Sequence, residues 1–208
     1  MTVQAEYSKS YSNFPSLNGK IAMVVAHPDD EVLWGGGLLA RLKGIDIYCC
    51  SIPRRDPERA FNFFKVAKYF GHNAFLLPFE ETEPSSNLTN LELLDLSEYD
   101  VVITHNPEGE YGHIHHVNVH EHVKNNFSGD VYYFGYGDGD LILSLTDSEL
   151  DGKRIALALY DKLSPFDNGK KKYEALLDRY DINFDYEFYS KGAREDSEYL
   201  KNLTKLSD

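Results

Sequence analysis

Two short segments of the sequence concentrate the residue types that bind metals and move protons. The first, AHPDDE, places His27, Asp29 and Asp30 within four positions. The second, YGHIHHV, contains His113 and His116, which are three residues apart and share a face if the segment is helical. Catalytic zinc sites use such imidazole and carboxylate groups, with three protein ligands and a position left for water. The two segments together predict a metal site.

Residue types alone leave the division of roles open. His27, one of the two aspartates and one histidine of the second segment would complete a ligand set. The other aspartate could take a proton from water bound to the metal, whose pKa a zinc ion lowers to about 7. A spare histidine could act as an acid or stabilise an oxyanion. A structural explanation also exists for the first segment, because carboxylates after a strand often cap the next helix.

The elements that would position these segments follow from the hydrophobic pattern. Short apolar runs predict strands at residues 20–26, 45–52, 73–77, 101–104, 131–134 and 141–145. The intervening stretches predict helices at 32–43, 57–70, 113–125, 148–162 and 170–180, with a weaker signal at 91–96. Glycines 35–37 would let the first helix approach the sheet closely. This alternation is typical of an α/β fold, a Rossmann-like three-layer sandwich with a mostly parallel sheet.

The ends of three predicted strands place both segments at one edge of that sheet. Ligands of parallel α/β sheets bind outside the carboxyl ends of the strands. The first strand ends at His27, the second near Pro53, and the fourth at His105, a few residues before the second segment. We therefore expect the two segments to meet at this edge.

Composition and charge exclude several classes of function. The chain has 208 residues, 42% hydrophobic and 26% charged, with a net charge of −13. The negative charge argues against nucleic acid or an anionic membrane as the main partner. The apolar runs are too short for a membrane span, and the first residues lack a signal-peptide pattern. Cys49 and Cys50 are adjacent and would point to opposite faces of a strand, so we expect no disulfide and a cytoplasmic location.

The length fits one domain. We expect an N-terminal arm at residues 1–19, a core at about 20–165 and a C-terminal appendage at 166–208. The last 25 residues are charged and rich in tyrosine, and their pattern predicts no particular element.

The two segments, in this order, resemble the LmbE-like, or PIG-L, family of zinc-dependent N-acetylglucosamine deacetylases. The resemblance rests on AHPDDE after the first strand and on TH followed by YGHxxHV after a later one. It covers residues 20–125 and extends more loosely to about 165. It implies an enzyme that uses zinc, or another divalent transition metal, to remove the acetyl group from an N-acetylglucosamine-type sugar or glycoconjugate. The partner would be a small molecule, and the oligomeric state is left open.

The resemblance also implies a role for each residue of the two segments. The metal ligands would be His27, Asp30 and His116. Asp29 would be the general base, and His113 would stabilise or protonate the transition state. Tyr111 would contribute to the oxyanion site. An arginine of the second helix would contact the substrate; the spacing to Gly71 puts it at Arg59, with Arg54 and Arg55 as rivals.

The chain departs from the family pattern at two positions. Many members carry Asp or Asn where this chain has His115, and a histidine cannot supply the negative charge that would orient His113. Glu108 and Glu110 are candidates to supply that charge. The family also often has Glu three residues after the arginine, and this chain has Asn62 there.

Two other functions are compatible with the same residues. The chain could be a zinc amidase for a non-sugar or unusual substrate, because the walls of the pocket come from segments such as 79–97 and 135–140, whose pattern is uninformative. It could also be a relative that binds metal without turnover. Trp34 could stack on a sugar face, although a place in the core is the more common role of such a residue.

Overall fold

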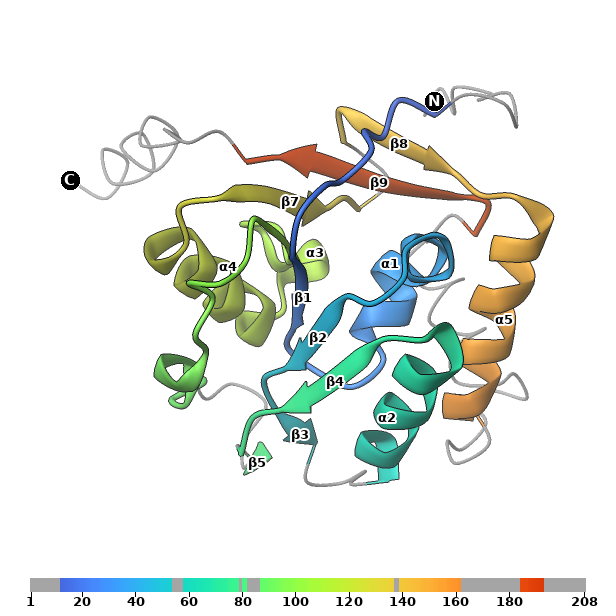
Figure 1. The fold of residues 1–208 in the computed structure, drawn as a ribbon. Helices are drawn as coiled ribbons and strands as arrows, with labels where there is room; N and C mark the ends of the chain where they lie inside the picture. The colour runs from blue at the N-terminus through green and yellow to red at the C-terminus, as the bar shows by residue number, and fades with distance from the viewer. Residues whose placement is uncertain are drawn as a thin grey trace.

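A central β-sheet organises the computed structural model, which describes residues 12–53, 58–78, 80–81, 87–136, 139–161 and 184–192 (Figure 1). Within these residues the sheet has seven strands in the order β4-β2-β1-β6-β7-β9-β8. The parallel strands are β4 (Asn73–Leu76), β2 (Asp46–Cys49), β1 (Ile21–Val25), β6 (Val101–Thr104) and β7 (Asp130–Phe134). β9 (Tyr186–Lys191) runs antiparallel to both of its neighbours, β7 and β8 (Leu141–Ser144).

Helices cover both faces of the sheet, which makes the three-layer α/β fold that the sequence predicts (Figure 1). One face packs against α1 (Asp30–Arg41), α2 (Glu58–Phe70) and α5 (Asp147–Asp161). The other packs against α4 (Ile114–Asn126) and the 3-10 helix η1 (Leu91–Leu93). The short helix α3 (Gly109–Gly112) precedes α4, and β3 (Ile52–Pro53) pairs with β5 (Glu80–Glu81) in a separate small sheet.

The central strand β1 shows why this arrangement follows from the sequence. All five of its residues are buried, and alternate side chains enter opposite cores. Met23 and Val25 pack in the core under α1, whereas Ala22 and Val24 pack in the core under α4. A strand that is buried on both faces requires a continuous apolar run, and IAMVV provides it.

The glycine run of α1 lets the helix approach its neighbours closely, as predicted. A Cβ on Gly35 would lie 2.9 Å from Cε of Met23 in β1, and one on Gly37 only 2.2 Å from a methyl carbon of Leu145. The helix is also kinked at Gly35, whose φ is −131° and ψ is 17°. The backbone N–H groups of Gly37 and Leu38 donate to the buried carboxylate of Glu187, at 2.6 and 2.9 Å.

Most predicted elements are confirmed, with differences where local pattern is weakest. The stretch 91–96 forms only the 3-10 turn η1, and the helix predicted at 170–180 lies outside the described residues. The sequence pattern did not predict β9. The described part of the N-terminal arm contacts β8, because the N–H of Asn13 donates to the carbonyl of Ile142 at 3.1 Å. Cys49 and Cys50 are free, buried and in opposite cores, as expected.

The described helices offer no candidate for a transmembrane segment, since none combines the necessary length and apolar character.

Candidate metal and catalytic site

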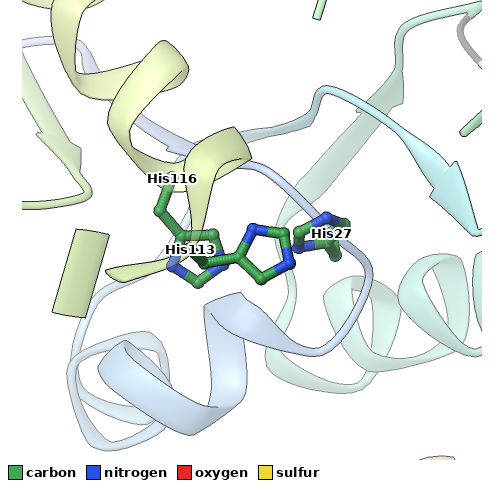
Figure 2. A group of neighbouring side chains, drawn as sticks. All are labelled: His27, His113 and His116. Carbon is green, nitrogen blue, oxygen red and sulfur yellow. The ribbon is translucent and has the colours of Figure 1, made fainter. Parts of the chain in front are cut away.

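The two segments meet at the carboxyl ends of β1 and β6, where the sequence places them. His27 follows β1, and His113 is the N-cap residue of α4. Figure 2 shows the rings of His27, His113 and His116 gathered between these elements. The ring centroid of His27 is 4.6 Å from that of His113 and 5.4 Å from that of His116.

A carboxylate oxygen of Asp30 is the point on which the ring nitrogens converge. Nδ1 of His27 and Nε2 of His116 each lie 3.2 Å from Oδ2 of Asp30. The backbone N–H of His27 donates to the same oxygen at 2.9 Å. His27, Asp30 and His116 are all buried, so these polar atoms meet away from bulk water.

Two overlapping groups of side chains have donor atoms close enough to hold one metal ion. Among the described residues, one group is His27, His113 and His116, and the other is Asp30, His105 and His116. In each group the donor atoms lie within 4.8 Å of one another. The three predicted ligands are thus spread over both groups, with His116 in common. The sequence predicts His105 only as the end of a strand, because its place beside Asp30 depends on the parallel pairing of β1 and β6.

The electrostatics of the site favour a positive charge beside Asp30. Burial disfavours a charged imidazole at His116, but the carboxylates of Asp30 and Glu110 outweigh this effect and raise the pKa of His116 to about 10. Burial likewise opposes the charge of Asp30, yet His116 and His27 hold the pKa of this carboxyl well below its usual range. The surroundings of Asp30 therefore favour a cation at the position of His116.

The donor set fits a divalent metal. Nε2 of His116 is buried, and within the described parts of the chain no partner reaches it with normal hydrogen-bond geometry. A buried ring nitrogen without such a bond is costly unless a ligand satisfies it. Imidazole nitrogens with one carboxylate oxygen suit zinc and similar transition metals.

Asp29 has a backbone conformation and contacts that set it apart from a helix cap. Its φ is +118°, an unfavourable value for a residue other than glycine, and its side chain makes no capping hydrogen bond to α1. The carboxylate forms an ion pair with Arg59 of α2 instead. Arg59 also donates from Nε and Nη2 to the carbonyl of Pro28, at 3.0 and 2.7 Å. The backbone N–H of Asp29 donates to Glu31 at 2.9 Å, which holds the turn in place.

His113 is held as a neutral ring by its surroundings. Burial and the nearby imidazoles of His27 and His116 lower the pKa of His113 to about 3. Its Nδ1 accepts a hydrogen bond from the backbone N–H of His115 at 3.2 Å. The proton of the neutral ring therefore lies on Nε2, and His113 is a hydrogen-bond donor at this atom.

His115 and Glu110 have contacts other than those expected from the sequence. Nδ1 of His115 lies 2.9 Å from Nε2 of His27, so His115 contacts a predicted ligand through its side chain. The carboxylate of Glu110 accepts from Nδ1 of His116 at 2.5 Å and from Nδ1 of His105 at 2.9 Å. Glu110 therefore brings a carboxylate to the histidine cluster, but it contacts His105 and His116, whereas the sequence suggests it as a partner of His113.

The remaining predicted site residues differ in how closely they approach the cluster. Tyr111 is 39% exposed, and its ring centroid lies 5.4 Å from that of His116 and 5.9 Å from that of His113. Trp34 is buried in the core under α1, which confirms the core position that is more common for such a residue. Its ring centroid lies 6.3 Å from that of Tyr111. Arg54 and Arg55 lie outside the described residues.

Comparison with known proteins gives strong structural matches and a weak match in sequence. No family model matches the chain. An uncharacterized protein, L374, of Acanthamoeba polyphaga mimivirus is 25% identical in a match that covers 55% of this chain. The match spans about 60% of that relative's length.

Several solved structures share the architecture. N,N'-diacetylchitobiose deacetylase from Pyrococcus horikoshii superposes with a TM-score of 0.68 at 15% identity, covering 89% of each chain. The A40926 pseudoaglycone deacetylase Dbv21 has a TM-score of 0.58 at 12% identity, with 82% of this chain and 95% of that one covered. The chain has the fold of these deacetylases. The 4-carboxy-2-hydroxymuconate hydratase GalB of Pseudomonas putida also matches, with a TM-score of 0.52 at 14% identity and with 86% and 98% covered. The fold therefore supports more than one reaction, and the site must decide between them.

Proposed function

We propose that the chain is a zinc-dependent hydrolase that removes the acetyl group from an N-acetylglucosamine-type sugar or glycoconjugate. The observation that carries the proposal is the separation of two adjacent carboxylates. Asp30 faces the ring nitrogens of His27 and His116, whereas Asp29 faces Arg59. These different contacts support a role for Asp30 as a metal ligand and a role for Asp29 as the group that moves a proton. The deacetylases among the structural neighbours support the same reaction class.

The hydrogen bonds favour one ligand set over the alternatives. Neutral His113 carries its proton on Nε2, because its Nδ1 accepts from an N–H group. Both ring nitrogens of His105 have hydrogen-bond partners: Nε2 accepts from the N–H of Ala26 at 2.9 Å, and Nδ1 lies 2.9 Å from Glu110. Neither ring keeps a lone pair for a metal. These contacts support His27, Asp30 and His116 as the proposed ligands.

Neighbouring groups can orient the lone pairs of both ligand histidines. Nε2 of His27 can donate to Nδ1 of His115, which leaves on Nδ1 of His27 the lone pair that faces Asp30. His116 can donate from Nδ1 to Glu110, which leaves a lone pair on Nε2. When bound, zinc would supply a Lewis acid that acidifies a water molecule and polarises the acetyl carbonyl.

The protein side chains would then carry out the proton transfers. Asp29 takes a proton from the water molecule as its oxygen forms a bond to the acetyl carbonyl carbon. His113 donates a hydrogen bond from Nε2 to the oxyanion that develops, and the partly exposed Tyr111, whose ring lies beside that of His113, contributes a second one. The C–N bond breaks and the amine nitrogen receives the proton from Asp29. The free amine and acetic acid are the products, and the acid loses its remaining proton to solvent as acetate.

Arg59 would hold the general base in position as well as contact the substrate. It pairs with Asp29 and donates twice to the carbonyl of Pro28, so it fixes both the side chain and the turn that carries it. Because Asp29 has a positive φ, these contacts offset the tendency of its backbone to relax. A role of Arg59 in substrate binding remains part of the proposal.

The test combines metal analysis with a substrate panel. Zinc content is measured on the purified chain, and acetate release is measured with N-acetylglucosamine derivatives and with non-sugar amides. Stoichiometric zinc with release from the sugars supports the proposal. Release from non-sugar amides alone favours a zinc amidase, and zinc without release on any substrate favours a silent metal-binding relative. A chain that binds no zinc or other divalent transition metal would contradict the proposed ligand set.

A further inference from the structure

Glu110 is a buried carboxylate that contacts two rings of the histidine cluster without itself belonging to either candidate ligand group. Its side chain is fully buried, as are those of His105 and His116. One oxygen, Oε2, accepts from Nδ1 of His116 at 2.5 Å and from Nδ1 of His105 at 2.9 Å. A single carboxylate oxygen thus contacts both imidazoles.

The hydrogen bonds around Glu110 determine which ring nitrogens carry protons. The N–H of Ala26 donates to Nε2 of His105, so this ring must carry its proton on Nδ1, where Glu110 accepts it. A carboxylate accepts but cannot donate, so His116 also presents N–H at Nδ1. The lone pair of neutral His116 is therefore on Nε2, the nitrogen 3.2 Å from Asp30.

The backbone around Glu110 is arranged to bring this carboxylate inward. Glu110 has a φ of +57°, a left-handed conformation that is uncommon for a residue other than glycine. Asn106 holds the turn from both sides: its N–H donates to Oε1 of Glu110 at 2.9 Å, and its Oδ1 accepts from the N–H of Glu110 at 3.0 Å. Nδ2 of Asn106 donates to the carbonyl of Phe134 at 3.0 Å, which ties the turn to the end of β7.

From these contacts we propose that Glu110 is the positioning residue of the metal site, which keeps His116 in its Nδ1–H tautomer and directs Nε2 toward the ion. The inference rests on the proposed ligand set and assigns a role that the ligands alone do not explain. Metal-binding histidines generally donate their second N–H to such a partner, whose loss weakens metal affinity about 10- to 100-fold.

The decisive experiment compares Glu110→Gln with Glu108→Gln. Each variant loses one carboxylate, and the two positions are only two residues apart in the sequence. Glu108 is exposed, whereas Glu110 is buried against the rings. Zinc dissociation constants are measured by competition with a chromophoric chelator, and the visible spectrum of the cobalt-substituted protein reports ligand geometry. We expect zinc binding by Glu110→Gln to weaken about 10- to 100-fold, with an altered cobalt spectrum, and Glu108→Gln to match the unsubstituted chain.

A second variant keeps the test decisive if Glu110→Gln does not fold, as judged by circular dichroism. Asn106→Ala leaves the carboxylate in place and removes only the side-chain half of the support. Asn106→Ala should also weaken zinc binding, by a smaller factor than Glu110→Gln.

The outcomes separate this inference from the proposed function. A folded Glu110→Gln protein with unchanged zinc affinity and cobalt spectrum overturns the role of Glu110 and leaves the deacetylase proposal intact. If Glu110→Gln does not fold, an Asn106→Ala protein with unchanged binding overturns it equally. If the unsubstituted chain binds neither zinc nor cobalt, the ligand set is wrong and this inference fails with it.

Discussion

The substitution Asp29→Asn tests the assignment of the two adjacent carboxylates most directly. Asn has nearly the same shape as Asp and tolerates positive φ better than most residues, so it can occupy the +118° conformation of this position. Asp29 belongs to neither group of potential metal ligands in the described residues. We therefore expect the variant to fold and to retain zinc, while it loses the proton acceptor.

The size of the effect follows from the chemistry of the lost group. A positioned general base contributes about 10²- to 10⁴-fold to a rate. Each factor of ten corresponds to about 1.4 kcal/mol, so the activation barrier should rise by about 3–5 kcal/mol. The ion pair with Arg59 is also lost, and because both side chains are largely buried, we expect a further cost in the free energy of unfolding.

The assay is acetate release at saturating substrate, with zinc content measured on the same preparation. Asp151→Asn is a matched control, because it removes the carboxylate of another Asp–Arg pair, 3.2 Å apart on the exposed surface of α5. The control should keep the rate and change the stability by less than about 1 kcal/mol. A turnover of Asp29→Asn within threefold of the unsubstituted chain would refute the role of Asp29 as base. Loss of zinc would instead make Asp29 a ligand.

Three further predictions concern the scaffold and the metal. Gly37→Ala places a methyl group 2.2 Å from Leu145 and should lower the free energy of unfolding by about 1–3 kcal/mol in urea titrations; an unchanged midpoint would show that α1 can shift at no cost. Lys153→Met leaves Glu187, which Lys153 contacts at 2.8 Å in the core, without its cation, and should cost about 3–5 kcal/mol. Adding Glu187→Gln should recover part of that loss, and a purely additive double variant would contradict the pairing. Zinc at 100 times its dissociation constant should stabilise the chain by about 2.7 kcal/mol over the chelated form in thermal unfolding, and equal midpoints would argue against a folded-state metal site.

The sequence by itself determined the layered fold and the meeting of the two histidine-containing segments. Both follow from local pattern. IAMVV reads as a strand buried on both faces, and His27 must follow its carboxyl end. Parallel strands place their carboxyl ends at one edge of the sheet, so the segment after β6 had to approach the segment after β1.

The tertiary structure alone decided how the site groups are paired. Whether Asp29 or Asp30 faces the histidines depends on a backbone turn with positive φ and on Arg59, which reaches Asp29 from α2. Glu110 reaches His116 because its own left-handed backbone turns the side chain inward. The local sequence pattern does not predict β9 either, because β9 pairs antiparallel with β7, a strand more than 50 positions earlier in the chain. Hydrophobic periodicity records which face of an element is buried, whereas these contacts depend on turns and long-range packing that periodicity does not encode.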